Sequence, residues 1–486
     1  MPGHSYRRNF IGGTRLALMP NPASIESWRS RLARFEQSHL LSFADTLSEI
    51  QLSQLLEQLS QIDLEAMHRL AIGADLAPNW SDLAARADAP PAIRVDDPAP
   101  TIRSCDAIAA GESAIRQGRV AMILAAGGQG TRLGFDHPKG LFPIGPLSGR
   151  TLFEMHIDRL RAVAQRFGVS IPLWIMTSPA TDQETREFFL KHQQFGLGPD
   201  ELTIFCQGSM PAVEATTGKI LLASKHEIAL SPDGHGGLLA ALEKNGLLHF
   251  AAQRGIKQIF YAQVDNPLVP ASDPELLGYH ISAASEMTTQ VVKKRFALEK
   301  VGNVVSIDGK VQIIEYSDLP AKYAEQTTAD GSLKLWAGNI AVHVFDVNFL
   351  QRVVRHADAL PFHRAHKPVP FVNPAGEMVQ PTAANAIKFE RFIFDLLPLA
   401  EKAIVVEGEA RQVFAPVKNA NGAPTDTPTA TQQAISNLHC QWLTSSGCTI
   451  DPGITVEIHP AWALDATEVK SRLVTPLHIS ADTYFA

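Results

Sequence analysis

Apolar residues recur at three- and four-residue steps close to the N-terminus, between Ile50 and Leu64. This spacing is typical of one face of a helix, so the pattern predicts helices from about Ser24 to Leu76. We expect them to pack as a helical layer that has no chemistry of its own. A stretch rich in proline and aspartate follows, from Ala89 to Pro100, and indicates a linker or an exposed crossing.

Short apolar runs then alternate with helical patterns. The runs are Val120–Ala125, Pro172–Thr177 and Gln258–Val264, and Thr151–Phe167 between the first two has apolar residues at helical spacing. Strands that alternate with helices predict an α/β fold, with a largely parallel sheet covered on both faces. Because ligands of such sheets bind beyond the carboxyl ends of the strands, we expect the loops there to carry the chemistry.

The pattern changes again beyond about Lys402. Ala403–Glu407 and Gly453–Ile458 are predicted strands, with a loop rich in Asn, Pro and Thr, Asn419–Thr429, between them. A chain of 486 residues is too long for one core, since single cores stop growing at about 250–300 residues. We therefore expect an N-terminal helical region (1–100), a central α/β domain (101–400) and a small C-terminal domain with β content (401–486).

Composition narrows the class of protein. Hydrophobic residues make up 45% of the chain and charged residues 19%, which is ordinary for a folded protein. The net charge of −7 does not suit nonspecific nucleic-acid binding, so a phosphate site must be local. Residues 1–20 lack the apolar stretch of a secretory signal, and no run of about eighteen apolar residues indicates a membrane span. The expected location is the cytoplasm.

Cysteine usage indicates neither a zinc site nor a disulfide framework. The cysteines are spread along the chain, and none belongs to a CxxC pair. We expect reduced thiols, although a bridge between the last two stays open. The four residues are Cys105, Cys206, Cys440 and Cys448.

The first apolar run ends directly in a glycine-rich loop, Gly127–Gly134. Glycines allow a sharp turn and let backbone N–H groups approach a ligand closely. Arg132 within the loop supplies a planar cation suited to phosphate, and Lys139 follows shortly after it. This combination predicts a triphosphate site rather than a simple turn.

Two other glycine-rich motifs fit the loop less well. A P-loop ends in Gly-Lys-Ser/Thr, and that ending is missing. A dinucleotide-binding fingerprint has a third glycine where this chain has Leu133, and it opens a helix, which Pro138 and Pro143 disfavour. An oxidoreductase that binds a nicotinamide or a flavin is therefore disfavoured.

The loop Leu124–Gly134, with Pro138-Lys139-Gly140 after it, resembles the signature of the eukaryotic-type UDP-sugar pyrophosphorylases, most of all their UDP-N-acetylglucosamine branch. The likeness extends over about residues 110–425. It implies a Rossmann-like, GT-A-like nucleotidyltransferase fold with a mixed, mostly parallel sheet. The other similar segments are Trp174–Ser178, Pro232–Gly237, Val264–Pro267, Ile314–Ser317, Ala337–Ala341, Ile387–Asp395 and Pro416–Ala420.

The resemblance implies that UTP and a sugar 1-phosphate react to a UDP-sugar and pyrophosphate, by Mg²⁺-assisted in-line attack without a covalent intermediate. Catalysis then depends on positioning and on neutralising charge. N-acetylglucosamine 1-phosphate is the implied acceptor, since UDP-glucose enzymes have an Asn-Gly-Gly-Leu-Gly-Thr type of loop. A UDP-glucose or UDP-GalNAc pyrophosphorylase and an inactive nucleotide-sugar-binding protein stay open, as do monomer and dimer.

The resemblance also assigns roles to single residues. Asp265 follows a predicted strand, and a carboxylate there can hold Mg²⁺. The role of His235 stays open because a family member has Asn there, and His343 is expected to be structural. The implied phosphate-binding catalytic residues are Arg132, Lys139 and Lys418. The implied nucleotide contacts are Gly127, Gly128, Gly130, Thr131, Gln207, Gly234 and His235, and the implied sugar contacts are Gly302, Glu315, Asn339, Phe394 and Lys388.

Overall fold

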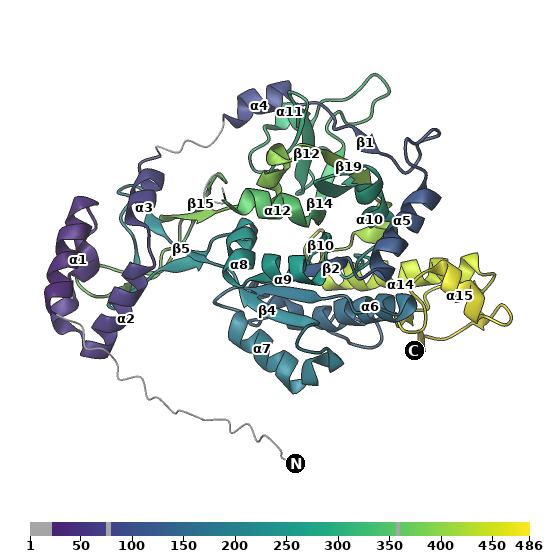
Figure 1. Cartoon of the computed structure of the whole chain (residues 1–486), viewed down its shortest axis with the longest axis horizontal. Helices are drawn as coiled ribbons and strands as arrows, with labels where there is room; N and C mark the ends of the chain where they lie inside the picture. The colour runs from purple at the N-terminus through teal and green to yellow at the C-terminus, as the bar shows by residue number, and fades with distance from the viewer. Residues whose placement is uncertain (1–21, 74–78, 356–359) are drawn as a thin grey trace, which may run out of the picture. The chain divides into compact units, whose positions relative to one another are not determined.

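The structure is a computed structural model that describes residues 22–73, 79–355 and 360–486 (Figure 1). Two predictions concern parts of the chain outside these residues: the lack of a secretory signal in residues 1–20, and the end of the helical region at Leu76. The chain forms two compact units, and the expected boundaries near residues 100 and 400 stay a prediction. The first unit joins the N-terminal part up to Asp75 with Met210–Ser231 and Ala365–Lys388, and the second joins Leu76–Ser209, Pro232–Arg364 and Phe389–Ala486.

The second unit is built on a mixed ten-stranded sheet. Its strand β14 is antiparallel to both neighbours, whereas the other pairs along the main path are parallel. The predicted α/β class with a mostly parallel sheet is confirmed. The path runs β1 (Ala92–Ile93), β19 (Ala403–Glu407), β11 (Met287–Lys293), β14 (Ala337–Asp346), β10 (Gln258–Gln263), β2 (Val120–Ala125), β3 (Leu173–Thr177), β4 (Leu202–Cys206). Off this path, β12 (Gly302–Ile307) pairs with β14, and β13 (Lys310–Ile314) pairs with β12.

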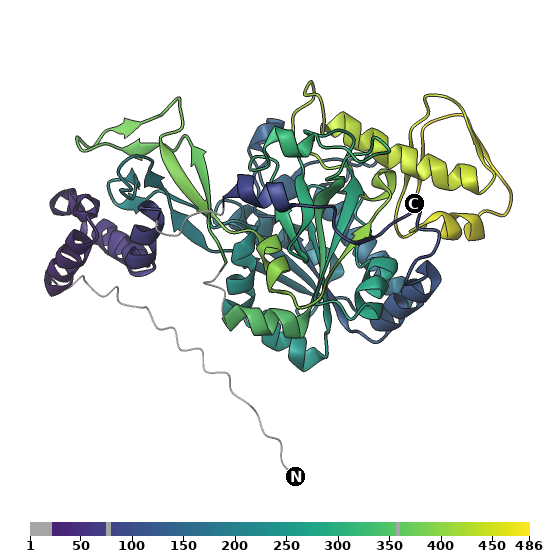
Figure 2. The same ribbon diagram turned by 90° about the horizontal axis from the view of Figure 1, so that it is seen from above.

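Strand β2 shows why these runs are continuously apolar. Alternate side chains of a strand point to opposite faces of a sheet. Met122 and Leu124 belong to the hydrophobic core on one face, whereas Ala121 and Ile123 belong to the core on the other. Both faces are covered by helices, as Figure 2 shows, so every position of the strand up to Leu124 is buried. The apolar runs therefore reflect a sheet with two cores.

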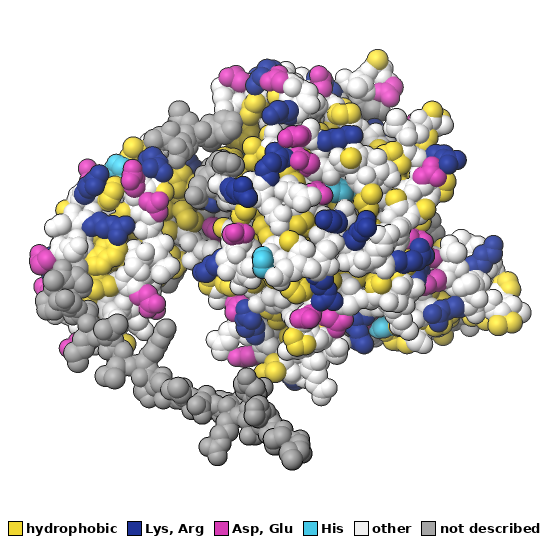
Figure 3. All heavy atoms as spheres, in the orientation of Figure 1, with side chains coloured by type: hydrophobic (Ala, Val, Ile, Leu, Met, Phe, Trp, Pro, Cys, Tyr) yellow, Lys and Arg dark blue, Asp and Glu magenta, His cyan; other side chains and the backbone are white. Residues whose placement is uncertain are grey.

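Helices of the second unit include α6 (Leu152–Phe167), which begins with a capping box formed by Thr151 and Glu154. Within the part of the chain that the structure describes, no helix is long and apolar enough to cross a membrane. Charges of both signs are mixed over the face seen in Figure 3, so this face has no broad basic surface that could bind phosphates nonspecifically. The other helices are α4 (Trp80–Arg86), α5 (Ser104–Arg116), α7 (Asp182–Lys191), α8 (Leu238–Lys244), α9 (Leu247–Arg254), α10 (Pro274–Ser282), α11 (Ala321–Ala324), α12 (Val347–Val353) and α13 (Ala410–Val413).

The C-terminal part differs from the expectation in two ways. Ala403–Glu407, expected in a separate domain, is β19 of the central sheet. A long helix, α14 (Pro428–Ser445), follows the polar loop, and Thr427 caps its start. Beyond it lie β20 (Thr449–Ile450), β21 (Val456–Ile458), α15 (Ala466–Arg472), β22 (His478–Ile479) and β23 (Thr483–Phe485). All four cysteines are free thiols, as expected.

The first unit packs three helices against short strands, and its predicted helical layer is confirmed. Side chains of the helical segment bond strand backbones: Gln37 Oε1 accepts from Ile220 N at 2.8 Å, and Gln58 Oε1 accepts from Ile228 N at 2.8 Å. The helices are α1 (Pro22–Arg34), α2 (Glu49–Ser60) and α3 (Leu64–Ala71). The strands are β6 (Val213–Glu214), β7 (Leu222–Ser224), β8 (Glu227–Ile228), β16 (Phe371–Val372) and β17 (Met378–Val379), while β5 (Ser209–Pro211), β9 (Leu230–Pro232), β15 (His363–Lys367) and β18 (Ala386–Glu390) run into the second unit.

Helices α5 and α10 approach each other at glycine contacts, which yields a stability prediction. A Cβ added to Gly278 would lie 1.6 Å from Ala107 O. Helix propensity alone favours Gly278→Ala by about 1 kcal/mol. Close packing opposes it, and we expect a loss of about 3 kcal/mol or more in the free energy of unfolding. Urea denaturation measures this value.

The matched control is Ser282→Ala at the exposed end of α10. It should change the free energy of unfolding by no more than about 0.5 kcal/mol. A Gly278→Ala protein as stable as the wild type would contradict the close α5–α10 contact.

Candidate active site

The glycine-rich loop follows the end of β2 and turns back on itself. Gly130 N donates to His137 O at 2.9 Å, and Lys139 N donates to Gly128 O at 3.0 Å. A Cβ on Gly130 would lie 2.7 Å from Phe135 O, so the packing of the loop itself requires this glycine. A Cβ on Gly128 would meet nothing within 4 Å. Gly128 therefore borders open space where a ligand can reach the backbone.

The cations expected on the phosphates lie around this loop. Thr131 and Arg132 are exposed in the 3-10 turn η3 (Thr131–Leu133), and Lys139 begins the next turn, η4 (Lys139–Leu141). Lys139 Nζ lies 3.6 Å from Asp265 Oδ2. The carboxyl ends of the parallel strands β2 and β10 thus bring the loop and Asp265 together, as the sequence predicted.

The C-terminal segment Val417–Ala420 joins the same edge. Val417 N donates to Asp265 O at 2.9 Å, and Ala420 N donates to Arg132 O at 3.0 Å. Asn266, next to Asp265, anchors the preceding residues, because its Nδ2 donates to Val413 O at 2.8 Å and its Oδ1 accepts from Ala415 N at 3.0 Å. Lys418 is therefore held beside the residues that are expected to bind phosphate and metal.

Asp426 is a residue of this edge that sequence reasoning missed. Its carbonyl accepts from Lys418 N at 2.8 Å. Burial raises the pKa of its carboxyl group, and the nearby charges of Lys418 and Arg295 oppose the rise, while that of Asp265 adds to it. Asp426 thus lies within electrostatic reach of both Lys418 and Asp265. It belongs to the polar loop noticed in the sequence, which gave no sign of this role.

Gln207 directly follows β4 and lies beside the glycine-rich loop. Its backbone N donates to Thr177 O at 2.9 Å, which extends the pairing of β3 and β4. Its Oε1 would lie 3.2 Å from a Cβ on Gly127, so the amide group borders that glycine. Ser178 Oγ donates to Gly127 O at 2.7 Å and fixes the start of the loop. The expected nucleotide contacts Gly127, Gly128 and Gln207 are thus neighbours.

Gly234 and Gly236 lie against the backbone of Arg391. Gly234 has φ of 80°, and a Cβ there would lie 2.3 Å from Arg391 O. A Cβ on Gly236 would lie 2.6 Å from Arg391 C. Arg391 N donates in turn to Asp233 O at 2.8 Å. Only glycine fits both positions, so this part of the motif serves close packing between two loops.

His235, in the 3-10 turn η6 (His235–Gly237), is half-buried against the aromatic rings of Phe392 and Phe394. Its Nδ1 accepts a hydrogen bond from Ile393 N at 3.1 Å. Burial lowers the pKa of the ring to about 4, with a smaller contribution from His363. His235 is thus neutral near pH 7, with its proton on Nε2, and it acts as an acceptor for a buried N–H group.

The expected sugar contacts Gly302, Glu315 and Asn339 converge. Gly302 pairs with Asn339 across β12 and β14, and a Cβ on Gly302 would lie 3.0 Å from Glu315 Oε1. Asn339 Oδ1 accepts from Ala341 N at 3.0 Å, which leaves the N–H groups of its amide for a ligand. Burial raises the pKa of Glu315 to about 7, and Asp318 adds to the rise while His363 and Lys418 oppose it. Lys418 therefore lies within electrostatic reach of this group.

A histidine–aspartate pair beside Glu315 was not predicted. His363 Nε2 and Asp395 Oδ2 are 2.9 Å apart, and both side chains are largely buried. The His363 ring stacks on Trp80 at 5.9 Å and contacts Phe392 at 4.2 Å. Asp395 ends a segment that resembles the family, but His363 stands outside all such segments, so sequence reasoning had no signal for it.

Phe394 and Lys388 have surroundings that differ from those expected of sugar contacts. Phe394 is 3% exposed and belongs to a hydrophobic core, within the 3-10 helix η8 (Ile393–Leu399). The neighbouring ring of Phe392 is less deeply buried than that of Phe394. Lys388 belongs to the first unit, where it lines a cavity of about 450 Å³ together with Gln58 and Glu227.

The residues around Asp265 fit a hard divalent cation. Among the described residues, no group of three or more His, Cys, Asp or Glu side chains could hold a metal ion by itself. Mg²⁺ in phosphate-transfer sites is bound by one or two carboxylates together with water and phosphate oxygens. Asp265, 8% exposed beside the glycine-rich loop, supplies such a carboxylate.

Comparisons with known proteins agree with this geometry. A family model described as UTP–glucose-1-phosphate uridylyltransferase (UDPGP) matches residues 95–439. The chain is 36% identical over 460 residues to human UDP-N-acetylhexosamine pyrophosphorylase-like protein 1, covering 90% of this chain and 88% of that protein. It is 38% identical over 356 residues to UDP-N-acetylglucosamine pyrophosphorylase of Saccharomyces cerevisiae, covering 72% and 74%. The structure of the Trypanosoma brucei UDP-N-acetylglucosamine pyrophosphorylase in complex with an inhibitor has a TM-score of 0.78 at 25% identity, over 96% of this chain and 100% of that one.

The acceptor role of His235 can be tested with two substitutions. In His235→Asn, the side-chain oxygen can take the place of Nδ1 and accept from Ile393 N, so stability should stay close to that of the wild type. In His235→Ala, the buried N–H group loses its acceptor, which should cost about 1–3 kcal/mol in the free energy of unfolding. Urea denaturation of both variants measures the difference. Equal losses in the two variants would refute the role.

Proposed function

The chain belongs to the UTP–glucose-1-phosphate uridylyltransferase (UDPGP) family, and we propose that it transfers the uridylyl group of UTP to N-acetylglucosamine 1-phosphate. The products are UDP-N-acetylglucosamine and pyrophosphate. One observation carries the proposal: the segment Val417–Ala420 is bonded to both Asp265 and Arg132. It brings Lys418 to an edge where phosphate-binding groups and the sugar-side carboxylate of Glu315 are both within reach.

Each part of this edge has a task in the proposed reaction. The open backbone at Gly128, together with Arg132 and Lys139, binds the triphosphate. A phosphate oxygen of the sugar 1-phosphate attacks the α-phosphorus, the bond from that phosphorus to the β-phosphate oxygen breaks, and pyrophosphate leaves. Lys418 stabilises the negative charge that both substrates bring to the reacting phosphorus. The protein needs no nucleophile of its own.

Mg²⁺ is the proposed metal, held by the carboxylate of Asp265. When bound, it neutralises phosphate charge and holds the triphosphate in one geometry. Lys139 Nζ, 3.6 Å from Asp265 Oδ2, keeps this carboxylate directed toward the glycine-rich loop. The proposed working location is the cytoplasm.

The sugar side favours an N-acetylhexosamine. The free amide N–H groups of Asn339 can donate to an N-acetyl carbonyl, and the carboxylate of Glu315 can accept from sugar hydroxyls. The names of the human and yeast relatives point to the same substrate class. Arg132, Lys139, Asp265 and Lys418 are all present, which argues against a binding protein without activity.

Turnover assays test the proposed activity. We expect Mg²⁺-dependent release of pyrophosphate from UTP with N-acetylglucosamine 1-phosphate, in preference to the GalNAc and glucose 1-phosphates. Lys418→Ala should lower kcat by about a hundredfold or more, because it removes a cation that stabilises the transition state. Lys402→Ala, a change of the same type at an exposed residue outside the site, is the control. Absence of turnover with every sugar 1-phosphate would refute the proposed activity. Preference for glucose 1-phosphate would refute only the proposed identity of the acceptor as N-acetylglucosamine 1-phosphate.

The raised pKa of Glu315 predicts a pH dependence. With a pKa of about 7, the fraction of Glu315 that is ionised rises between roughly pH 6 and 8. Because the ionised carboxylate accepts hydrogen bonds from sugar hydroxyls with both oxygens, the KM for the sugar 1-phosphate should fall over this range. Glu315→Gln cannot ionise, and ionisation of the substrate phosphate affects both proteins equally. The ratio of variant KM to wild-type KM should therefore rise with pH, and a constant ratio would show that Glu315 does not titrate there.

A further inference from the structure

A large cavity lies in the second unit away from the glycine-rich loop. Its volume is about 1040 Å³, which suffices for a small organic molecule. Helices α5, α6, α10, α14 and α15 and the turn after β19 surround it. None of the residues expected to bind substrate or metal in the candidate active site, such as Gly127, Asp265 and Lys418, lines it. The cavity is thus a separate space with walls of its own.

Arg159 of α6 lines this cavity and is the unusual group in it. Its Nη1 donates to Pro267 O at 2.9 Å and to Val269 O at 2.8 Å. Within the described ranges, its Nε and Nη2 atoms have no hydrogen-bond partner, and no carboxylate lies within ion-pair distance of it. Burial lowers the pKa of its guanidinium group to about 10, and no acidic side chain offsets this. The side chain is part-buried and no acidic side chain of the described residues pairs with it, so its vacant donors are open to an anion.

The other arginines of the cavity differ from Arg159, because each has an acidic partner. Four of the eight carboxylates of the lining belong to these pairs, and Arg159 is the arginine of the lining that belongs to none. The pairs are Arg94 with Glu407 at 2.6 Å, Arg116 with Glu112 at 2.7 Å, and Arg166 with Asp465 at 2.8 Å and Glu468 at 2.7 Å.

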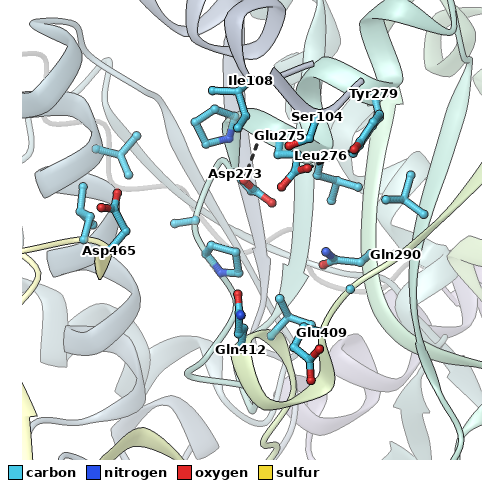
Figure 4. A pocket seen from close by; sticks show the side chains of 18 of the residues that line it. Ser104, Ile108, Asp273, Glu275, Leu276, Tyr279, Gln290, Glu409, Gln412 and Asp465 are labelled. Carbon is cyan, nitrogen blue, oxygen red and sulfur yellow. Dashed lines mark hydrogen bonds between the residues drawn. The ribbon is translucent and has the colours of Figure 1, made fainter. Parts of the chain in front are cut away.

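The remaining walls suit the body of an organic ligand. Apolar side chains of Val163, Leu276 and Trp442 offer contact area. The Asp273 carboxylate, at the start of α10, and the Gln290 amide, on β11, point toward the same space (Figure 4). These oxygens can accept hydrogen bonds from hydroxyl or amino groups. A ligand that fits both walls has an anionic group and a body with hydrogen-bond donors.

We propose that this cavity binds a small organic anion, a phosphate or carboxylate whose body carries hydroxyl or amino groups, with its anionic group on Nε and Nη2 of Arg159. A guanidinium group offers two parallel N–H donors to such an anion, and this bidentate geometry is among the stronger hydrogen-bonding arrangements. The same arginine holds the carbonyls of Pro267 and Val269 in the loop that follows Asp265. Occupancy of the cavity therefore stabilises that loop.

Thermal unfolding in the presence of anions tests the proposal. The full-length protein is kept with saturating UTP and without divalent metal, so that the active-site cations are occupied. Inorganic phosphate and malonate are then titrated separately, which distinguishes a phosphate site from a carboxylate site. We expect at least one of them to raise the melting temperature in a saturable way. Absence of saturable stabilisation by either anion would overturn the proposal.

Substitutions locate the effect. Arg159→Met should raise the half-saturating anion concentration about tenfold or more, because the charged hydrogen bonds are lost. Arg161→Met removes the same charge from an exposed position of the same helix and should leave the half-saturating concentration unchanged. An unchanged value in Arg159→Met would refute the site, as would an equal shift in both variants.

A second measurement does not depend on the folding of a variant. Crystals of the wild-type protein soaked in selenate should show an anomalous scattering peak beside Nε and Nη2 of Arg159. Selenium at Arg132, Lys139 and Lys418 alone, with none at Arg159, would overturn the proposal. Failure of the proposed uridylyltransfer would leave both measurements of the cavity unaffected, so the two proposals can fail separately.

Discussion

Two backbone hydrogen bonds determine the arrangement of the candidate site. Val417 N donates to Asp265 O, and Ala420 N donates to Arg132 O. They join the loops after β2 and β10 to a segment that is remote in the sequence, and they leave Lys418 between the two bonded residues. Such bonds depend on the path of the chain rather than on particular side chains. Asn266 is one side chain that supports this path, because it pairs with the backbone of Val413 and Ala415. In the Asp265-Asn266 pair, one residue thus lies beside Lys139 of the candidate site and the other holds the C-terminal segment in place.

Glycines around the site serve two different purposes. Gly234 and Gly236 allow backbone to pack on Arg391, and Gly130 allows the loop to close on Phe135, whereas Gly128 borders open space. Close packing of two loops also leaves a backbone N–H group, that of Ile393, in need of an acceptor, and neutral His235 provides it. An asparagine offers an acceptor at a comparable distance from the backbone. The difference from the family at this position is therefore compatible with one structural role.

The sequence predicted those parts of the fold that depend on local pattern. The runs that became β2, β3 and β10 were readable because strands buried on both faces are continuously apolar. Helix α14 was missed, since its first turns follow a loop rich in Asn, Pro and Thr, and β19 was assigned to another domain because its parallel partners are remote in sequence. The grouping of Gly302, Glu315 and Asn339 followed from resemblance. The pair of His363 and Asp395 depends on tertiary contacts alone, so no spacing in the chain could reveal it.

Helix α6 connects the cavity with the candidate active site. His156 Nε2 bonds Val264 O at 3.1 Å, and because a carbonyl can only accept, this nitrogen carries the proton. Arg159, about one turn further on, bonds Pro267 O and Val269 O. One helix therefore fixes the backbone on both sides of Asp265, with an uncharged donor before it and a charged donor after it. The position of the Asp265 carboxylate depends on this backbone as well as on Lys139. A change at the Arg159 guanidinium consequently reaches the proposed metal-binding carboxylate through a few covalent bonds, without any movement of the sheet.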